Sequence, residues 1–237
     1  MSEIEWHETS EYQPSAGLVA AFCTENHLSP AHIPPTKQPL VFIERQALEA
    51  LYDFLAHDLE REHGGVLVGQ PYYDSQARRF FIVVQAAVPA QETEGSSIHL
   101  QFTPDTWDYI AGIIEENFPE LVIVGWYHSH PALGVFMSGI DRATQRAFYN
   151  HPWSLAVVVD PIAQQTGWFT GPGCLILNER HVIPFESPDR SYASGKSRLG
   201  EEYWGQQVLH KLRWLLPFGL LTLCAALLWW YARRPLA

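Results

Sequence analysis

Two histidines, a serine and an aspartate stand at a regular spacing near the middle of the sequence, in the run VGWYHSHPALGVFMSGID. His128, His130, Ser138 and Asp141 form the pattern H-x-H-x7-S-x2-D. Two imidazoles and one carboxylate are a common ligand set of catalytic zinc sites, which leave a fourth position open for water. The residue types therefore predict a metal site that activates a water molecule for hydrolysis.

The residues around this pattern predict how the three ligands come together. The preceding run LVIVGWY is apolar, β-branched and aromatic, which indicates a buried strand. Alternate residues of a strand point to the same side, so His128 and His130 share a face. The Pro and Gly of HPALG end the strand, and the pattern IDRATQRAFY is helical from Gly139. Asp141 is therefore expected in the first turn of a helix, close to both histidines.

A water activated by zinc needs a base that takes its proton and passes it to the leaving group. The candidate is Glu62, in the run EREHGGVLVG. It stands where a helix predicted over residues 45–60 gives way to a Gly-Gly turn and the strand VLVG. The apolar face of that helix recurs at intervals of three and four, at Leu48, Leu51, Leu55 and Leu59. His63, the neighbour of Glu62, is expected to point away from the metal.

Together, E-x-x-G-x-L-x-G and H-S-H-P-x6-S-x2-D resemble the JAMM (MPN+) metalloproteases, which include zinc deubiquitinases. The resemblance covers roughly residues 39–186 and implies an MPN (JAB-type) domain of the α/β class, with a mixed β-sheet flanked by helices. It implies that His128, His130 and Asp141 bind one Zn²⁺ with a catalytic water, and that Glu62 is the general base and later the acid. Ser138 would hydrogen-bond the oxyanion, although it could also be only the N-cap of the following helix.

The implied activity is that of a zinc isopeptidase or peptidase that cleaves after the C-terminal tail of ubiquitin or a ubiquitin-like protein, including its conjugates. The same chemistry could instead process a sulfur-carrier protein of the ubiquitin fold. A non-catalytic, membrane-bound MPN scaffold is the third reading, but scaffold members have lost metal ligands that this chain keeps. RadC-like proteins share the spacing, usually with Asn between the histidines, where this chain has Ser129.

Other apolar runs predict the remainder of an α/β sandwich. Thr103, Pro104 and Asp105 are typical of a helix start, while AQETEGSSIHLQF is expected to be a loop that leads into a short strand. Trp126 and Trp168 are expected in the core. The remaining strands are predicted at PLVFIE, VLVGQPYY, RRFFIVVQAAV, WSLAVVVDP, TGWFT and CLILN.

The composition excludes some classes of function. The formal net charge of −11 argues against a nucleic-acid partner, because binding to phosphates needs clustered Lys and Arg. Cys23, Cys174 and Cys224 are scattered and show no C-x-x-C spacing. This favours a reducing compartment over a disulfide framework, and it argues against a second zinc site built from cysteines.

The termini differ in composition from the centre. We expect an acidic N-terminal extension over 1–38, the catalytic domain over 39–186, a linker over 187–213 and a short basic tail over 233–237. Residues 214–232, WLLPFGLLTLCAALLWWYA, carry no charge and are long enough to cross a bilayer. Lys and Arg are more numerous before this span than after it, which favours a cytoplasmic catalytic domain on a single-pass C-terminal membrane anchor.

Overall fold

The computed structural model describes residues 13–90, 94–96 and 99–187. The predicted transmembrane helix over 214–232 and basic tail over 233–237 lie outside the described residues, as does nearly all of the predicted linker. Among the helices within the described ranges, none is long and apolar enough to cross a membrane.

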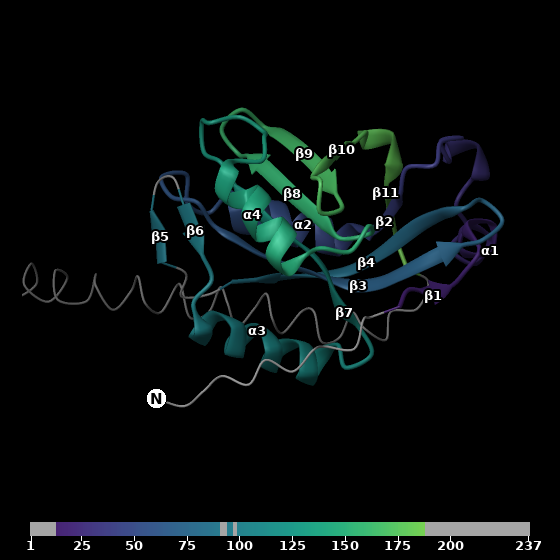
Figure 1. Ribbon diagram of the computed structural model, residues 1–237, viewed down its shortest axis with the longest axis horizontal. Coiled ribbons are helices and arrows are strands. Elements are labelled where there is room, and N and C mark those ends of the chain that lie inside the picture. The colour runs from purple at the N-terminus through teal and green to yellow at the C-terminus, as the bar shows by residue number, and fades with distance from the viewer. Residues whose placement is uncertain (1–12, 91–93, 97–98, 188–237) are drawn as a thin grey trace, which may run out of the picture. The chain divides into compact units, whose positions relative to one another are not determined.

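The described residues contain both strands and helices, as an α/β protein does (Figure 1). The helices are α1 (Val19–Glu25), α2 (Arg45–Leu55), α3 (Pro104–Asn117) and α4 (Gly139–Phe148), with 3-10 turns at Pro30–His32 and Glu179–His181. The strands are β1 (Ser15–Ala16), β2 (Leu40–Glu44), β3 (Gly64–Asp74), β4 (Arg79–Pro89), β5 (Glu94–Ser96), β6 (His99–Gln101), β7 (Val122–Ser129), β8 (Leu155–Asp160), β9 (Gln165–Thr170), β10 (Leu175–Leu177) and β11 (Val182–Phe185).

Within the described ranges, one nine-stranded sheet has the order β10-β9-β8-β7-β3-β4-β2-β11, and β1 pairs with β3. β3 and β4 form the predicted antiparallel hairpin, and β7 lies antiparallel to β3 on its other side. β8 runs parallel to β7, and β2 runs parallel to both β4 and β11. The predicted α/β fold with a mixed sheet flanked by helices is therefore confirmed. Before α3, the predicted short strand is present as β6, and within the loop predicted ahead of it β5 forms and pairs with β6 in a separate hairpin.

Alternation along β7 separates the two faces of the sheet. Tyr127 faces α2, where its ring lies 6.4 Å from the ring of Phe54. Trp126 faces the other way and packs with Tyr149, at the end of α4. Trp107 of α3 packs against the same cluster. The helices that follow β6 and β7 thus cover the face to which His128 points.

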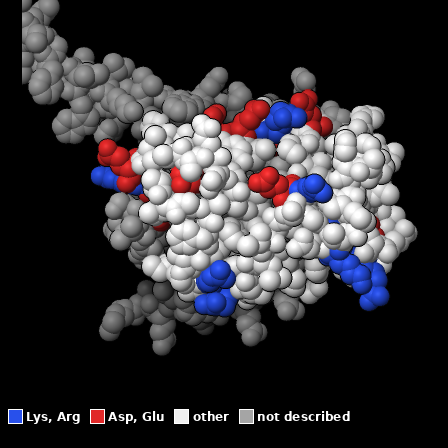
Figure 2. Space-filling model, turned by 90° about the horizontal axis from the view of Figure 1, so that it is seen from above, with Lys and Arg blue, Asp and Glu red and all other residues white. Residues whose placement is uncertain are grey.

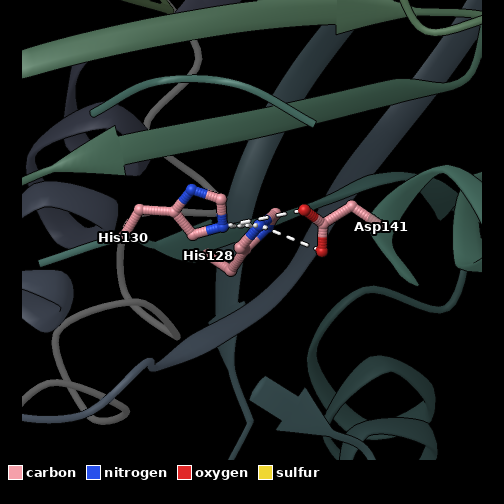
Figure 3. Close-up of side chains that lie close together, drawn as sticks. All are labelled: His128, His130 and Asp141. Carbon is pink, nitrogen blue, oxygen red and sulfur yellow. Dashed lines mark hydrogen bonds and ion pairs between the residues drawn. The ribbon is translucent and has the colours of Figure 1, made fainter. Parts of the chain in front are cut away.

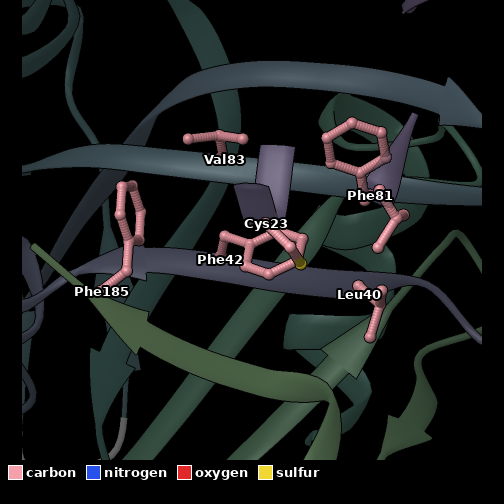
Figure 4. Close-up of a cluster of buried hydrophobic side chains, with 7 residues drawn as sticks. Cys23, Leu40, Phe42, Phe81, Val83 and Phe185 are labelled. Carbon is pink, nitrogen blue, oxygen red and sulfur yellow. The ribbon is translucent and has the colours of Figure 1, made fainter. Parts of the chain in front are cut away.

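The N-terminal segment covers another part of the sheet. α1 inserts its fully buried Cys23 among aromatic side chains from three strands (Figure 4). Arg79 donates hydrogen bonds to the carbonyl oxygens of Pro34 and Gln38, at 2.9 and 2.6 Å. The described part of the predicted N-terminal extension therefore packs on the sheet. The aromatic members of the cluster are Phe42, Phe81 and Phe185, with the partly buried Phe22 packed against them.

The prediction for residues 45–65 is wrong in two details. α2 ends at Leu55, so the helix predicted over 45–60 is too long. The Asp58 carboxylate accepts the backbone amides of Glu60 and Arg61, a local turn that competes with the helix. Gly65 is part of strand β3 rather than of a turn. The position needs glycine because a Cβ there would overlap the Val88 carbonyl and the Tyr127 hydroxyl.

Candidate metal centre

Both histidines come from the carboxyl end of β7, as the sequence predicts. β7 lies between β3 and β8 in the interior of the sheet. The His130 backbone amide donates to the Val159 carbonyl oxygen at 2.8 Å, which extends the contact with β8 beyond the end of the strand. His128 is fully buried and His130 is 2% exposed. Their positions are therefore fixed by the sheet itself.

Asp141 comes from the first turn of α4, and a capping box fixes that turn. The Asp141 amide donates to Ser138 Oγ at 3.2 Å, and the Ser138 amide donates to Asp141 Oδ2 at 2.7 Å. Two amides that the start of a helix leaves unpaired are satisfied in this way. The predicted capping role of Ser138 is confirmed. One carboxylate thus both caps the helix and faces the histidines.

The three side chains converge on one point (Figure 3). The Nε2 atoms of His128 and His130 lie 3.1 Å apart. Asp141 Oδ1 lies 3.5 Å from His128 Nε2, and Oδ2 lies 3.6 Å from His130 Nε2. Ligands about 2.0–2.1 Å from a tetrahedral zinc are separated from each other by roughly 3.4 Å. The donor set and its spacing therefore fit Zn²⁺.

The charges around the cluster favour an ionised Asp141 and a neutral His130. Burial alone would raise the pKa of the Asp141 carboxyl, but the nearby His128 and the hydrogen bonding with Ser138 outweigh it and hold that pKa below its usual range. Burial, together with the neighbouring His128, lowers the pKa of His130. A carboxylate and a neutral imidazole are the protonation states that a metal requires of its ligands.

Glu62 reaches the cluster from a loop distant in sequence. Its Oε1 atom lies 3.8 Å from His130 Nε2, and the residue is 5% exposed. The structure thus brings all five predicted site residues into one neighbourhood. It places Glu62 beside the three candidate ligands and Ser138 at the start of α4.

The sequence of the chain matches a family model described as prokaryotic homologs of the JAB domain, over residues 44–170. This is more than half of the chain. The chain belongs to this family. The mixed sheet with its flanking helices is accordingly the fold of a JAB (MPN) domain, as the sequence pattern predicts.

Proteins of known name are similar to parts of this chain. A COP9 signalosome complex subunit 5 from Eremothecium gossypii is 35% identical over 166 residues, which are 67% of this chain and 36% of that protein. The 26S proteasome regulatory subunit rpn11 from Schizosaccharomyces pombe is 32% identical over 149 residues, 62% of this chain and 47% of that protein. The ubiquitin carboxyl-terminal hydrolase RPN11 from Saccharomyces cerevisiae is 31% identical over 80 residues, 33% of this chain and 26% of that protein. The matched segments span less than half of each relative.

A stack of aromatic rings lies against the candidate ligand His128 of this JAB domain. The ring of Trp126 lies 4.5 Å from that of His128, with 11° between their planes, and Tyr149 stacks on its other side. The indole N–H of Trp126 donates to Gln145 Oε1 at 2.7 Å. The Gln145 amide donates in turn to the carbonyl oxygens of Tyr149 and Gly171. These contacts tie α4, which carries Asp141, to β7, which carries His128.

A buried carboxylate fixes the loop between the histidines and Ser138. Asp160, at the end of β8, accepts the backbone amides of Ala132 at 3.1 Å and of Gly134 at 2.9 Å. It also accepts the amides of Ile162 and Ala163 on its own side. Burial opposes its ionisation, but these four amides outweigh burial and hold the pKa of the Asp160 carboxyl below its usual value. Gly134 has a φ of +83°, a conformation that suits glycine.

Gln145 and Asp160 were not predicted from the sequence as functional residues, although both support the ligands. Each is a polar residue in an apolar neighbourhood, buried to 0% and 1% exposure. Polar residues that interrupt buried segments need partners inside the protein. The Asp that ends the apolar run LAVVVD is the one visible signal for Asp160.

Apolar side chains are exposed beside the site. Phe136 is 46% exposed and its ring lies 4.9 Å from that of His130, while Leu133 of the same loop is also 46% exposed. Figure 2 shows the side of the molecule on which β9 and β10 lie in Figure 1. Lys and Arg side chains are scattered there over a surface that is mostly uncharged. On β10, Leu175 and Ile176 are 67% and 73% exposed.

Proposed function

We propose that this chain is a zinc-dependent isopeptidase or peptidase that cleaves after the C-terminal tail of ubiquitin or a ubiquitin-like protein. The observation that carries the proposal is the position of Glu62, whose carboxylate lies 3.8 Å from His130 Nε2 at the edge of a donor set that fits zinc. Structural zinc sites usually have four protein ligands, whereas catalytic sites have three and a water. The three donors here, with the buried Glu62 carboxylate beside them, correspond to the catalytic type.

The proposal gives each of the site residues a part in the reaction. His128, His130 and Asp141 bind the metal, which when bound polarises the scissile carbonyl and makes water acidic enough to ionise near neutral pH. Glu62 accepts the proton of the attacking water and then donates it to the leaving amine, so no proton is gained or lost in the cycle. Its burial, with 5% exposure, keeps bulk water from competing for that proton.

Ser138 is proposed to stabilise the oxyanion. Its Oγ accepts the Asp141 amide as part of the capping box. A hydroxyl that accepts one hydrogen bond can still donate one. The Ser138 hydroxyl can therefore donate to the carbonyl oxygen of the substrate as negative charge develops on that oxygen. Because the cap fixes Oγ beside the ligands, this donor needs no reorganisation during the reaction.

The substrate is proposed from the relatives and from the surface beside the site. One relative carries the name ubiquitin carboxyl-terminal hydrolase. Extended C-terminal tails are bound through main-chain pairing and apolar pockets for alternate side chains. Leu133 and Phe136, exposed next to the ligands, offer apolar contacts to such a tail. We further propose that the uncharged run over 214–232 anchors the chain in a membrane, with the catalytic domain on the cytoplasmic side.

The test measures two properties of the full chain: zinc per chain, and cleavage of a ubiquitin-like protein that carries a C-terminal fusion. We expect one zinc, together with cleavage that stops when a chelator is added. Zinc binding without cleavage of any fusion would contradict the proposed activity. Absence of zinc after supplementation would favour a non-catalytic scaffold. A panel that includes ubiquitin and a ubiquitin-fold sulfur carrier would distinguish deubiquitination from sulfur-carrier processing.

A further inference from the structure

Ser129, the residue between the two histidines, contacts the loop that carries Glu62. Its Oγ accepts the backbone amide of His63 at 2.9 Å, although the two residues are 66 positions apart in the sequence. The Ser129 amide donates to the His63 carbonyl oxygen at 2.8 Å. Ser129 is fully buried, so water does not compete for these bonds.

These two bonds end the pairing between β3 and β7. Gly64 is in register with His128, so His63 lies opposite Ser129. In a regular antiparallel ladder the two residues would exchange bonds between backbone atoms only. Here the serine hydroxyl accepts the His63 amide. The chain is thus held to β7 by a side chain at the residue that directly follows Glu62.

Other contacts of the loop over 57–63 are less buried or lie toward α2. His63 Nε2 lies 3.2 Å from Asp58 Oδ2, but both side chains are partly exposed. The His63 ring also packs edge-on against Phe54 of α2, at 5.9 Å. The hydrogen bonds to Ser129 are a buried attachment directly next to Glu62.

We propose that Ser129 is a positioning residue that fixes the distance between Glu62 and the metal ligands. The inference rests on the proposed function of Glu62 as the base. A hydroxyl at this position is required because it accepts the His63 amide, whereas an alanine leaves that buried amide without its acceptor. Ser129 touches neither substrate nor metal, so its loss should lower turnover while metal binding continues.

The experiment compares Ser129→Ala with Ser129→Thr, which keeps the hydroxyl. For Ser129→Ala we expect one zinc per chain, an almost unchanged KM, and a kcat lower by about 10–100-fold, the range typical of lost supporting contacts. Ser129→Thr should restore most of the kcat. Amide exchange of the peptide that contains His63, followed by mass spectrometry, should be faster in the alanine variant than in the threonine variant.

Ile82→Val, in the core of β4, is the matched control, because it lowers stability without touching the loop. A Ser129→Ala enzyme with wild-type kcat and wild-type amide exchange would overturn the inference. Loss of zinc in that variant would also overturn it, since the effect would then act on the ligands. If the wild type cleaves and Glu62→Gln does not, the proposed function stands, and either of these results for Ser129→Ala refutes only the role of Ser129. If the wild type does not cleave, the proposed function fails and the role of Ser129 fails with it.

Discussion

The candidate metal ligands and the proposed base approach the same point from regions with very different support. His128 and His130 stand on an interior strand of the sheet, and Asp141 starts a helix that is capped and tied to that strand through Gln145. Glu62 stands on a loop that follows α2, and that loop is bound through hydrogen bonds at Ser129 and around Asp58 and through packing of His63 on α2. The positions of the candidate ligands are thus set by regular secondary structure. The position of the proposed base is set by the contacts of one loop.

This difference predicts two classes of variant. Changes on the ligand side should remove the metal and lower stability together, since the same elements serve both. Changes on the loop should lower turnover while the metal stays bound. The variants below test this separation, from the largest expected effect to the smallest.

His128→Ala should abolish both zinc binding and cleavage. It removes one of three ligands and leaves the buried Asp141 carboxylate without the imidazole that stabilises its charge. The zinc content, measured by elemental analysis, should fall from one zinc per chain to none. His32→Ala, at an exposed position outside the sheet, is the control and should keep its zinc. Retention of zinc by His128→Ala would show that the metal binds elsewhere.

Glu62→Gln should keep one zinc per chain and lose most activity. Without the proton acceptor, kcat is expected to fall by about 10²–10⁴-fold, the contribution of a positioned base. Glu60→Gln, on the exposed side of the same loop, is the matched control and should cleave normally. Turnover at the wild-type rate by Glu62→Gln would exclude Glu62 as the base.

Gln145→Leu should weaken zinc binding, although Gln145 is not one of the proposed ligands. It removes the acceptor of the Trp126 indole and the donor to two carbonyl oxygens, which should cost about 1–3 kcal/mol of stability. Zinc affinity, measured by competition with a chelator, should fall by about tenfold or more. Arg146→Leu, at an exposed position of α4, should change neither quantity. An unchanged zinc affinity in Gln145→Leu would mean that α4 is oriented by its cap alone.

Asp160→Asn should lower stability near neutral pH, because the carboxylate accepts four backbone amides. The pKa of Asp160 is lower in the folded protein than the value of about 3.9 expected when unfolded. Its stabilisation is therefore complete above that unfolded value and is lost as pH falls through the folded pKa. Melting temperatures measured against pH should differ between wild type and variant by an amount that shrinks below about pH 4. A difference that does not depend on pH would contradict a role for the charge.

Asp58→Asn should have the smallest effect. The ion pair with His63 is partly exposed, and such pairs contribute at most about 1 kcal/mol. The loss in kcat should therefore stay within about fivefold, with zinc unchanged. A larger loss than in Ser129→Ala would show that the loop is held mainly from its outer side.

The sequence predicted best where the deciding residues are close together in the chain. Ser138 and Asp141 form a capping box across three positions, and the β3–β4 hairpin follows from two apolar runs joined by the polar turn DSQA. The end of α2 was predicted too late because the turn at Asp58 outweighed the helical pattern. The bond from His63 to Ser129 spans 66 positions, and no local pattern indicates it. The catalytic and metal-binding roles of the five site residues stay predictions.

The packing of α1 has a practical consequence for expression. The family match covers residues 44–170, whereas α1, most of β2 and all of β11 lie outside these limits. A fragment cut at those limits would expose Phe81 and the apolar face of β4, which α1 and the strands beside it normally cover. Exposed apolar strand edges favour aggregation. Fragments for crystallisation or assay should therefore begin before β1 and extend through Phe185.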